Sequence, residues 1–202
     1  SVRFALKRTP VVGSVVRNSR MSGSAMDSAP CDNATDLFRL ERQAWRNGYV
    51  RVAGVDEVGR GPLAGPVVAA AVVLPEEARS LPVADSKTLT PAIREELDRR
   101  LRETPGIQIG LGVVDAPEID RVNILRATHE AMRQAVLALC PAPDFALVDG
   151  LSVPDFPVPA EFVVRGDALS ASVAAASIVA KVYRDRLMVE LARNQWAEAT
   201  EL

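Results

Sequence analysis

The chain has 202 residues, of which 48% are hydrophobic and 25% charged, and its formal net charge is −2 at pH 7. This length suffices for one α/β domain with a sizeable core, and the composition is ordinary for a globular protein. There is no run of 18 apolar residues, so we expect no membrane span, and the small negative charge is not typical of a basic nucleic-acid-binding protein.

Residues 1–34 carry scattered Ser, Gly, Asn and Pro without a hydrophobic period, which predicts a disordered N-terminal extension. The first 26 residues contain five basic residues and no acid, so a targeting or nucleic-acid-contacting arm is the alternative. No apolar segment followed by a cleavage signal indicates secretion. Cys31 and Cys140 have neither metal-site spacing nor a disulfide framework. We therefore expect free thiols and a cytoplasmic protein.

The remaining elements follow in chain order. A helix is expected over 36–47, and strand-like runs follow at 50–56, 67–74 and 107–114. Amphipathic helices are expected over 91–102 and 117–139, and short strands over 145–148 and 161–164. A buried helix should run from about residue 169 to Arg193. This order predicts an α/β fold with a mixed central sheet, occupying residues 35–194.

Asp56 and Glu57 end the first strand-like run and lead into a glycine-rich loop. Desolvating a carboxylate is costly unless hydrogen bonds or a cation compensate, and a divalent cation is the natural candidate here. Asp149 ends a second apolar run in the same way. Because α/β sheets assemble sites at the ends of their strands, these acids are candidates for one site. Solvated acids in loops are the alternative.

Other polar residues have simpler alternatives. Asp167 precedes the long helix, where it could be an N-cap, a metal-site acid or both. Asp185 lies four residues after Lys181 and is expected to form an ion pair with it. His129 is the only histidine, which rules out a multi-histidine zinc site and favours a surface or packing role.

Arg60 and Lys87 are candidate phosphate contacts, with a solvated loop lysine as the alternative for Lys87. The glycines on either side of Arg60, Gly59 and Gly61, would let backbone N–H groups approach a sugar or phosphate closely. The loop has neither the spacing of the dinucleotide fingerprint nor a Walker lysine, which argues against a nucleotide-binding domain.

These residues together resemble ribonuclease HII, the type 2 ribonuclease H family. The main motif is GVDEVGRGPLAGP at 54–66. The others, in the family's order and spacing, are DSK at 85–87, VDG at 148–150, GD at 166–167 and AASIVAKVYRD at 175–185. The resemblance covers about residues 48–190 and implies a ribonuclease H-like fold.

The resemblance also implies an endoribonuclease that cleaves RNA in RNA–DNA hybrids and incises 5′ to ribonucleotides embedded in duplex DNA, as in ribonucleotide excision repair. The catalytic, metal-binding acids it implies are Asp56, Glu57, Asp149 and Asp167, and the cofactor is Mn²⁺ or Mg²⁺. Two such hard ions prefer carboxylate oxygens and suit phosphodiester hydrolysis.

For the substrate, the resemblance implies that Gly59, Arg60 and Gly61 sense the 2′-hydroxyl, which distinguishes RNA from DNA, and that Lys87 contacts a phosphate. It implies no obligate protein partner, and we expect a monomer. Residues 195–202 match nothing in the family's usual C-terminal segment, whose tyrosine stacks at the RNA–DNA junction. A relative that binds hybrids but cleaves them weakly is therefore the second hypothesis.

Overall fold

The structure, a computed structural model, describes residues 36–61, 64–83 and 89–200, with side chains left undescribed at Arg79 and beyond Asn194. The described residues belong to one compact unit spanning 35–202. The expectations for residues 1–34, Cys31 and Lys87 lie outside the described residues.

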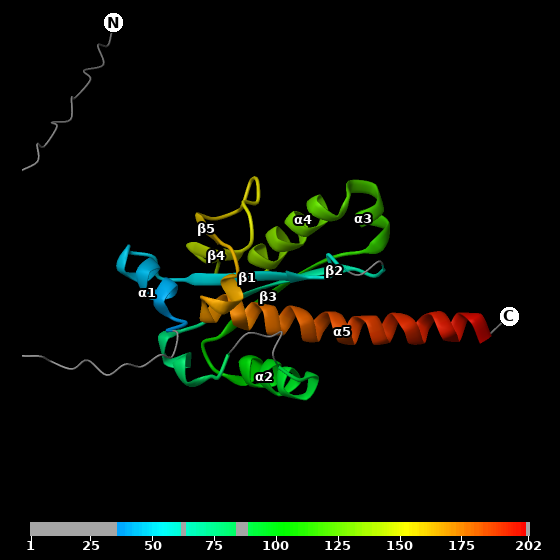
Figure 1. Cartoon of the computed structure of the whole chain (residues 1–202), viewed down its shortest axis with the longest axis horizontal. Helices are drawn as coiled ribbons and strands as arrows, with labels where there is room; N and C mark the ends of the chain where they lie inside the picture. The colour runs from blue at the N-terminus through cyan, green and yellow to red at the C-terminus, as the bar shows by residue number, and fades with distance from the viewer. Residues whose placement is uncertain (1–35, 62–63, 84–88, 201–202) are drawn as a thin grey trace, which may run out of the picture. The chain divides into compact units, whose positions relative to one another are not determined.

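A mixed five-stranded sheet forms the centre of this unit (Figure 1). The strands are β1 (Val52–Val58), β2 (Val67–Val73), β3 (Gln108–Val114), β4 (Phe145–Asp149) and β5 (Ala160–Val163). Their order across the sheet is β3-β2-β1-β4-β5. The β1–β2 and β2–β3 pairs are antiparallel, whereas β1–β4 and β4–β5 are parallel. The mixed α/β sheet predicted from the sequence is confirmed.

Helices cover both faces of the sheet. They are α1 (Arg39–Arg46), α2 (Pro91–Glu103), α3 (Ala116–Val122), α4 (Ile124–Leu137) and α5 (Ala171–Thr200), with short 3₁₀ helices η1 (Glu76–Ser80) and η2 (Gly166–Ala168). As Figure 1 shows, α3 and α4 lie on one side of the sheet and α2 and α5 on the other. No helix in the described ranges is both long enough and apolar enough to cross a membrane.

Two helices differ from their predicted bounds. The single helix expected over 117–139 is two helices, because Asn123 has a positive φ of 76° that breaks the ladder and its side chain accepts the Arg126 N–H at 3.1 Å. Asparagine tolerates positive φ better than most non-glycine residues and is a favoured N-cap. Helix α5 extends to Thr200, beyond the predicted end near Arg193.

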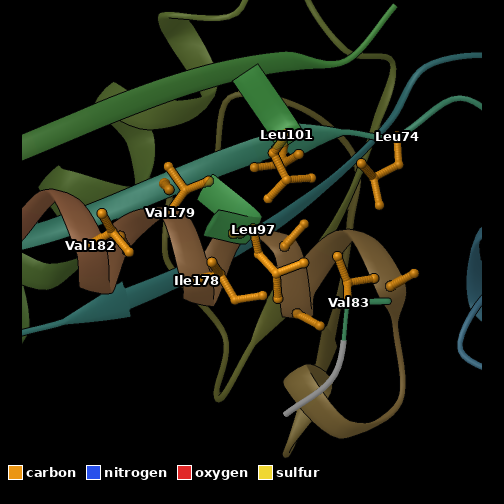
Figure 2. Close-up of a cluster of buried hydrophobic side chains, with 14 of the residues drawn as sticks. Leu74, Val83, Leu97, Leu101, Ile178, Val179 and Val182 are labelled. Atoms are coloured by element: carbon orange, nitrogen blue, oxygen red, sulfur yellow. The ribbon is translucent and has the colours of Figure 1, made fainter. Parts of the chain in front are cut away.

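Strand β2 is buried on both faces, which explains its uninterrupted apolar sequence. One set of its side chains packs with α2 and α5, and the alternate set packs with α4. Figure 2 shows the first layer, where Leu97 and Leu101 of α2 meet Ile178 and Val179 of α5. The long helix α5 is therefore fixed against the sheet along its N-terminal half.

Gly54 of β1 allows α5 to cross the sheet at close range. A Cβ atom built on Gly54 would lie 2.1 Å from the backbone carbon of Ser172. Only glycine avoids that overlap. The first turn of α5 therefore lies directly against β1, the strand that also carries Asp56 and Glu57. This contact brings the start of α5 and the end of β1 into one region.

Candidate functional site

Asp56 and Asp149 lie on two neighbouring parallel strands. The register of β1 and β4 pairs Val55 with Val148, and the next residue in each strand is a carboxylate. Because the two strands run in register, their next side chains point to the same face of the sheet. The sequence predicted both positions as strand ends; this is confirmed for Asp149, whereas β1 continues past Asp56 to Val58, where it still pairs with β2.

Asp56 is buried, with 6% of its surface exposed. One of its oxygens, Oδ1, accepts the Glu57 N–H at 2.8 Å, and the Ser177 hydroxyl of α5 also donates to the carboxylate. Burial raises the pKa of Asp56 well above its usual value, and the charges of Glu57 and Asp149 raise it further, while the hydrogen bond from Ser177 opposes them. Asp56 is therefore an acid whose charge is poorly compensated in the absence of a cation.

Glu57 is half-buried and occupies the last part of the same strand. Burial raises the pKa of Glu57, and the charge of Asp149 adds to the rise, whereas Arg60 lowers it. Arg60 Nη1 lies 3.3 Å from Glu57 Oε1, and half of the arginine side chain is exposed. The charge of Asp149 thus couples Glu57 to the neighbouring acids, and the ion pair with Arg60 couples it to the glycine-rich loop.

Asp149 connects the strand ends to the start of α5. Its Oδ1 accepts the Gly166 N–H at 2.6 Å, and Gly166 begins η2. The next residue, Asp167, is buried at 3% exposure. Helix α5 begins only at Ala171, and Ser170 Oγ accepts the Val173 N–H at 3.2 Å. Ser170 is therefore the cap of α5, and the interpretation of Asp167 as its N-cap is wrong.

The donor chemistry of this site fits a hard divalent cation. Asp56, Glu57, Asp149 and Asp167 offer only carboxylate oxygens, which Mg²⁺ and Mn²⁺ prefer. A cation would also offset the repulsion that raises the pKa of Asp56 and Glu57. Across the described ranges no three Asp, Glu, His or Cys side chains already form a close metal-binding group.

The loop after β1 begins at Gly59, whose φ is +106°. A Cβ atom there would lie 2.6 Å from the Pro66 carbonyl oxygen and 2.8 Å from Arg184 Nε. Arg184 of α5 is buried and donates to the Pro66 and Ala64 carbonyls at 2.9 and 3.0 Å. Gly59 thus has a strict backbone requirement, while a Cβ at Gly61 would meet open space.

Sequence reasoning missed Ser177, Arg184 and Glu41 as parts of this region. The sequence did contain a signal for Arg184. A fully charged side chain among small, apolar helix residues needs buried hydrogen-bond acceptors. Ser177 and Glu41 carry no local signal, since their partners lie far away in the sequence. The ion pair between Lys181 and Asp185 is confirmed.

His129 lies in α4 beside a hollow of about 1050 Å³ that also exposes Arg126, Glu130 and Arg133. Partial burial lowers the pKa of His129, and the charges of Arg133 and Arg60 lower it further. His129 is half-buried, in line with the surface or packing role expected from the sequence.

Comparison with known proteins agrees with this arrangement. The family model described as Ribonuclease HII matches residues 53–200. A ribonuclease HII of Geobacillus thermodenitrificans is 54% identical over 159 residues, which are 79% of this chain and 61% of that protein. One of Chlamydia trachomatis serovar A is 56% identical over 152 residues, which are 75% of this chain and 70% of that protein.

Among solved structures, the ribonuclease H2 from Pyrococcus horikoshii OT3 superposes with a TM-score of 0.63 at 32% identity, covering 71% of this chain and 76% of that one. The likeness shows the ribonuclease H-like fold. The chain spans about 60% of the length of the Geobacillus relatives that it matches.

Proposed function

The chain belongs to the ribonuclease HII family, and from this we propose that it is a divalent-metal-dependent endoribonuclease that cleaves the RNA strand of RNA–DNA hybrids. The observation that carries the proposal is that Asp56 and Asp149 directly follow the paired residues Val55 and Val148 of adjacent parallel strands, together with the raised pKa values of Asp56 and Glu57. Such pKa shifts mark acids whose surroundings suit a cation.

Asp56, Glu57, Asp149 and Asp167 would hold Mn²⁺ or Mg²⁺. When bound, two such ions supply an activated water and neutralise charge on the phosphate and on the leaving oxygen. The protein's part is to hold the acids in place. Ser177 orients Asp56, and the Gly166 N–H orients Asp149.

We assign incision at single ribonucleotides to the loop that contains Gly59, Arg60 and Gly61. The 2′-hydroxyl is the local difference between RNA and DNA, and backbone N–H groups flanked by glycines can approach it closely. The ion pair of Arg60 with Glu57 supports this assignment, because it connects the loop directly to a metal-site acid. Lys87 is proposed as a phosphate contact, and the protein is proposed to act as a cytoplasmic monomer.

The test is cleavage of two end-labelled substrates, each in Mn²⁺ and in Mg²⁺: an RNA–DNA hybrid, and a DNA duplex that contains one ribonucleotide. We expect incision of both. Asp149→Asn should lower the rate more than about a hundredfold, because several kcal/mol of charge stabilisation depends on metal ligands. The fold should persist, since the amide oxygen of asparagine can still accept the Gly166 N–H.

Each other outcome has a defined meaning. Cleavage of the hybrid alone would remove the proposed recognition of single ribonucleotides. Binding of the hybrid by folded protein without cleavage in either metal would favour the hybrid-binding, weakly cleaving relative. Near-normal turnover by Asp149→Asn would remove the metal-site assignment.

A further inference from the structure

Glu41 is a buried carboxylate that binds the first turn of α5. It lies in α1, and only 1% of its surface is exposed. Its Oε1 accepts from the Ser170 hydroxyl at 2.6 Å, from the Ser172 N–H at 2.9 Å and from the Ser172 hydroxyl at 2.7 Å. The other oxygen, Oε2, is buried and has no hydrogen-bond partner.

Burying this carboxyl group costs more free energy than an ordinary structural contact does. A buried carboxylate loses its hydration, and an oxygen without a partner recovers none of that loss. An apolar side chain in α1 would pack at this place without the penalty. A carboxyl group is nevertheless present where α1 meets the N–H groups of the first α5 turn.

Helix α1 and Leu37, which precedes it, bind this turn at more than one atom. The Leu37 carbonyl accepts the Ala171 N–H at 2.9 Å, and Glu41 accepts the next N–H, that of Ser172. Ser170 Oγ, itself bound to Glu41, accepts the Val173 N–H. The first N–H groups of α5 are therefore bound by Leu37 and by Glu41 of α1, either directly or through Ser170.

A short chain of hydrogen bonds continues from this turn to the candidate metal site. The Ser170 N–H donates to the Gly166 carbonyl at 2.8 Å, and the Gly166 N–H donates to Asp149 Oδ1 at 2.6 Å. Asp167 follows Gly166 directly and is buried inside this same turn. The position of Asp167 relative to Asp149 thus depends on how the start of α5 is held.

We propose that Glu41 is a positioning residue for the metal site: by fixing the Ser170–Ser172 turn it sets the placement of Asp167 beside Asp149. The inference rests on the proposed function, since it assumes that these acids bind a divalent cation. Glu41 does not contact the ion or the substrate. Its effect passes through Ser170 and Gly166.

The test compares Glu41→Ala with two other variants of the full chain. Glu41→Gln keeps an oxygen that can accept the same three hydrogen bonds. Asp98→Ala is the matched control, because Asp98 of α2 is also 1% exposed and also binds a residue of α5, Arg186, at 3.1 Å. The readouts are the thermal midpoint, the Mn²⁺ dissociation constant from the electron paramagnetic resonance signal of free Mn²⁺, and separate kcat and KM values on the hybrid.

We expect Glu41→Ala to weaken Mn²⁺ binding about tenfold or more, as substitutions behind metal ligands do, and to lower kcat with little change in KM. Glu41→Gln should restore Mn²⁺ binding close to the wild-type value. Asp98→Ala should lower the thermal midpoint while leaving Mn²⁺ affinity unchanged. If Glu41→Ala does not fold, Ser172→Ala replaces it, because it removes one donor and keeps the N–H.

Unchanged Mn²⁺ affinity in folded Glu41→Ala, or in Ser172→Ala when that variant is used, would overturn the inference and leave Glu41 a structural anchor. Equal losses of Mn²⁺ affinity in Glu41→Ala and Asp98→Ala would overturn it too, since general destabilisation would then explain both. Wild-type protein that binds Mn²⁺ without cleaving hybrid contradicts the proposed activity alone. Wild-type protein that binds no Mn²⁺ contradicts both.

Discussion

At the residue scale, Asp56 is an ionisable side chain in a buried position. It lies in β1 after buried residues that begin at Val52, yet it carries a charge that burial and two neighbouring acids disfavour. A group with a raised carboxyl pKa binds protons more readily in the folded than in the unfolded state. Its contribution to stability is therefore lost as the pH rises from the ordinary aspartate pKa through the raised one.

From this conflict we predict the behaviour of Asp56→Asn. In EDTA its thermal midpoint should fall less than that of the wild type as the pH rises above 4, because the variant has no charge to bury. Added Mn²⁺ should raise the midpoint of the wild type and not that of the variant. Differential scanning calorimetry measures both effects. Asp120→Asn, on the exposed surface of α3, is the control and should behave as the wild type does.

Individual site residues were predictable from sequence to different degrees. Asp56 and Asp149 each end an apolar run, so both were predicted as strand ends, which is right for Asp149, while β1 continues past Asp56 to Val58. Ser177 was not, because its hydrogen bond to Asp56 joins residues far apart in the chain. The same holds for Glu41, whose bond to Ser172 spans 131 positions. Contacts of this kind exist only once the fold has brought α1, β1 and α5 together.

At the element scale, the division between α3 and α4 shows where periodicity misleads. The apolar spacing continues through 117–139, so it predicts one helix, but Asn123 adopts a positive φ and caps the second helix. Asn123→Ala should lower the free energy of unfolding by about 1–2 kcal/mol, because it removes the cap and places at positive φ a residue that tolerates it less well than asparagine.

Asn123→Gly separates these two causes. Glycine also lacks the capping side chain but adopts positive φ without strain, so the loss should be only about a few tenths of a kcal/mol. Urea unfolding followed by circular dichroism measures both variants. Equal losses for alanine and glycine would show that strain at this position contributes nothing.

The contact between β1 and α5 gives a second prediction at this scale. Gly54→Ala places a methyl group where the Ser172 backbone lies 2.1 Å away, so α5 must move off the strand. We expect a loss of about 2 kcal/mol or more in the free energy of unfolding, at the upper end of overpacking effects. Gly61→Ala is the matched control for stability, because a Cβ there meets nothing within 4 Å.

At the scale of the whole molecule, the order of strands and helices was predictable because each run has a clear period or a turn signal. The pairing of β1 with β4 and the resulting sheet order were not, since local patterns do not say which strands are neighbours. The family resemblance predicted the ribonuclease H-like fold, which hydrophobic periodicity alone could not identify.

Net charge also belongs to this scale. At −2 the protein as a whole does not attract nucleic acid, so the proposed hybrid binding must depend on a few local basic side chains. Lys87→Ala should weaken binding uniformly and reduce the slope of log affinity against log salt by about 1. Arg99→Ala, in an exposed ion-pair cluster on α2, should leave the slope unchanged. Fluorescence anisotropy over a salt series tests both, and an unchanged slope for Lys87→Ala contradicts a phosphate contact.

The parallel pairing of β1 with β4 has a consequence for synthesis on the ribosome. Asp56 and Glu57 are made early, but their partner Asp149 is added only after β2, β3 and the three helices α2, α3 and α4. Asp167 and the turn that holds it come later still. At roughly 5–20 residues per second, a nascent chain spends several seconds with its first acids exposed and no second strand to complete the site. If the protein is the proposed nuclease, an incomplete chain lacks the activity, which then depends on the later strands and helices being in place.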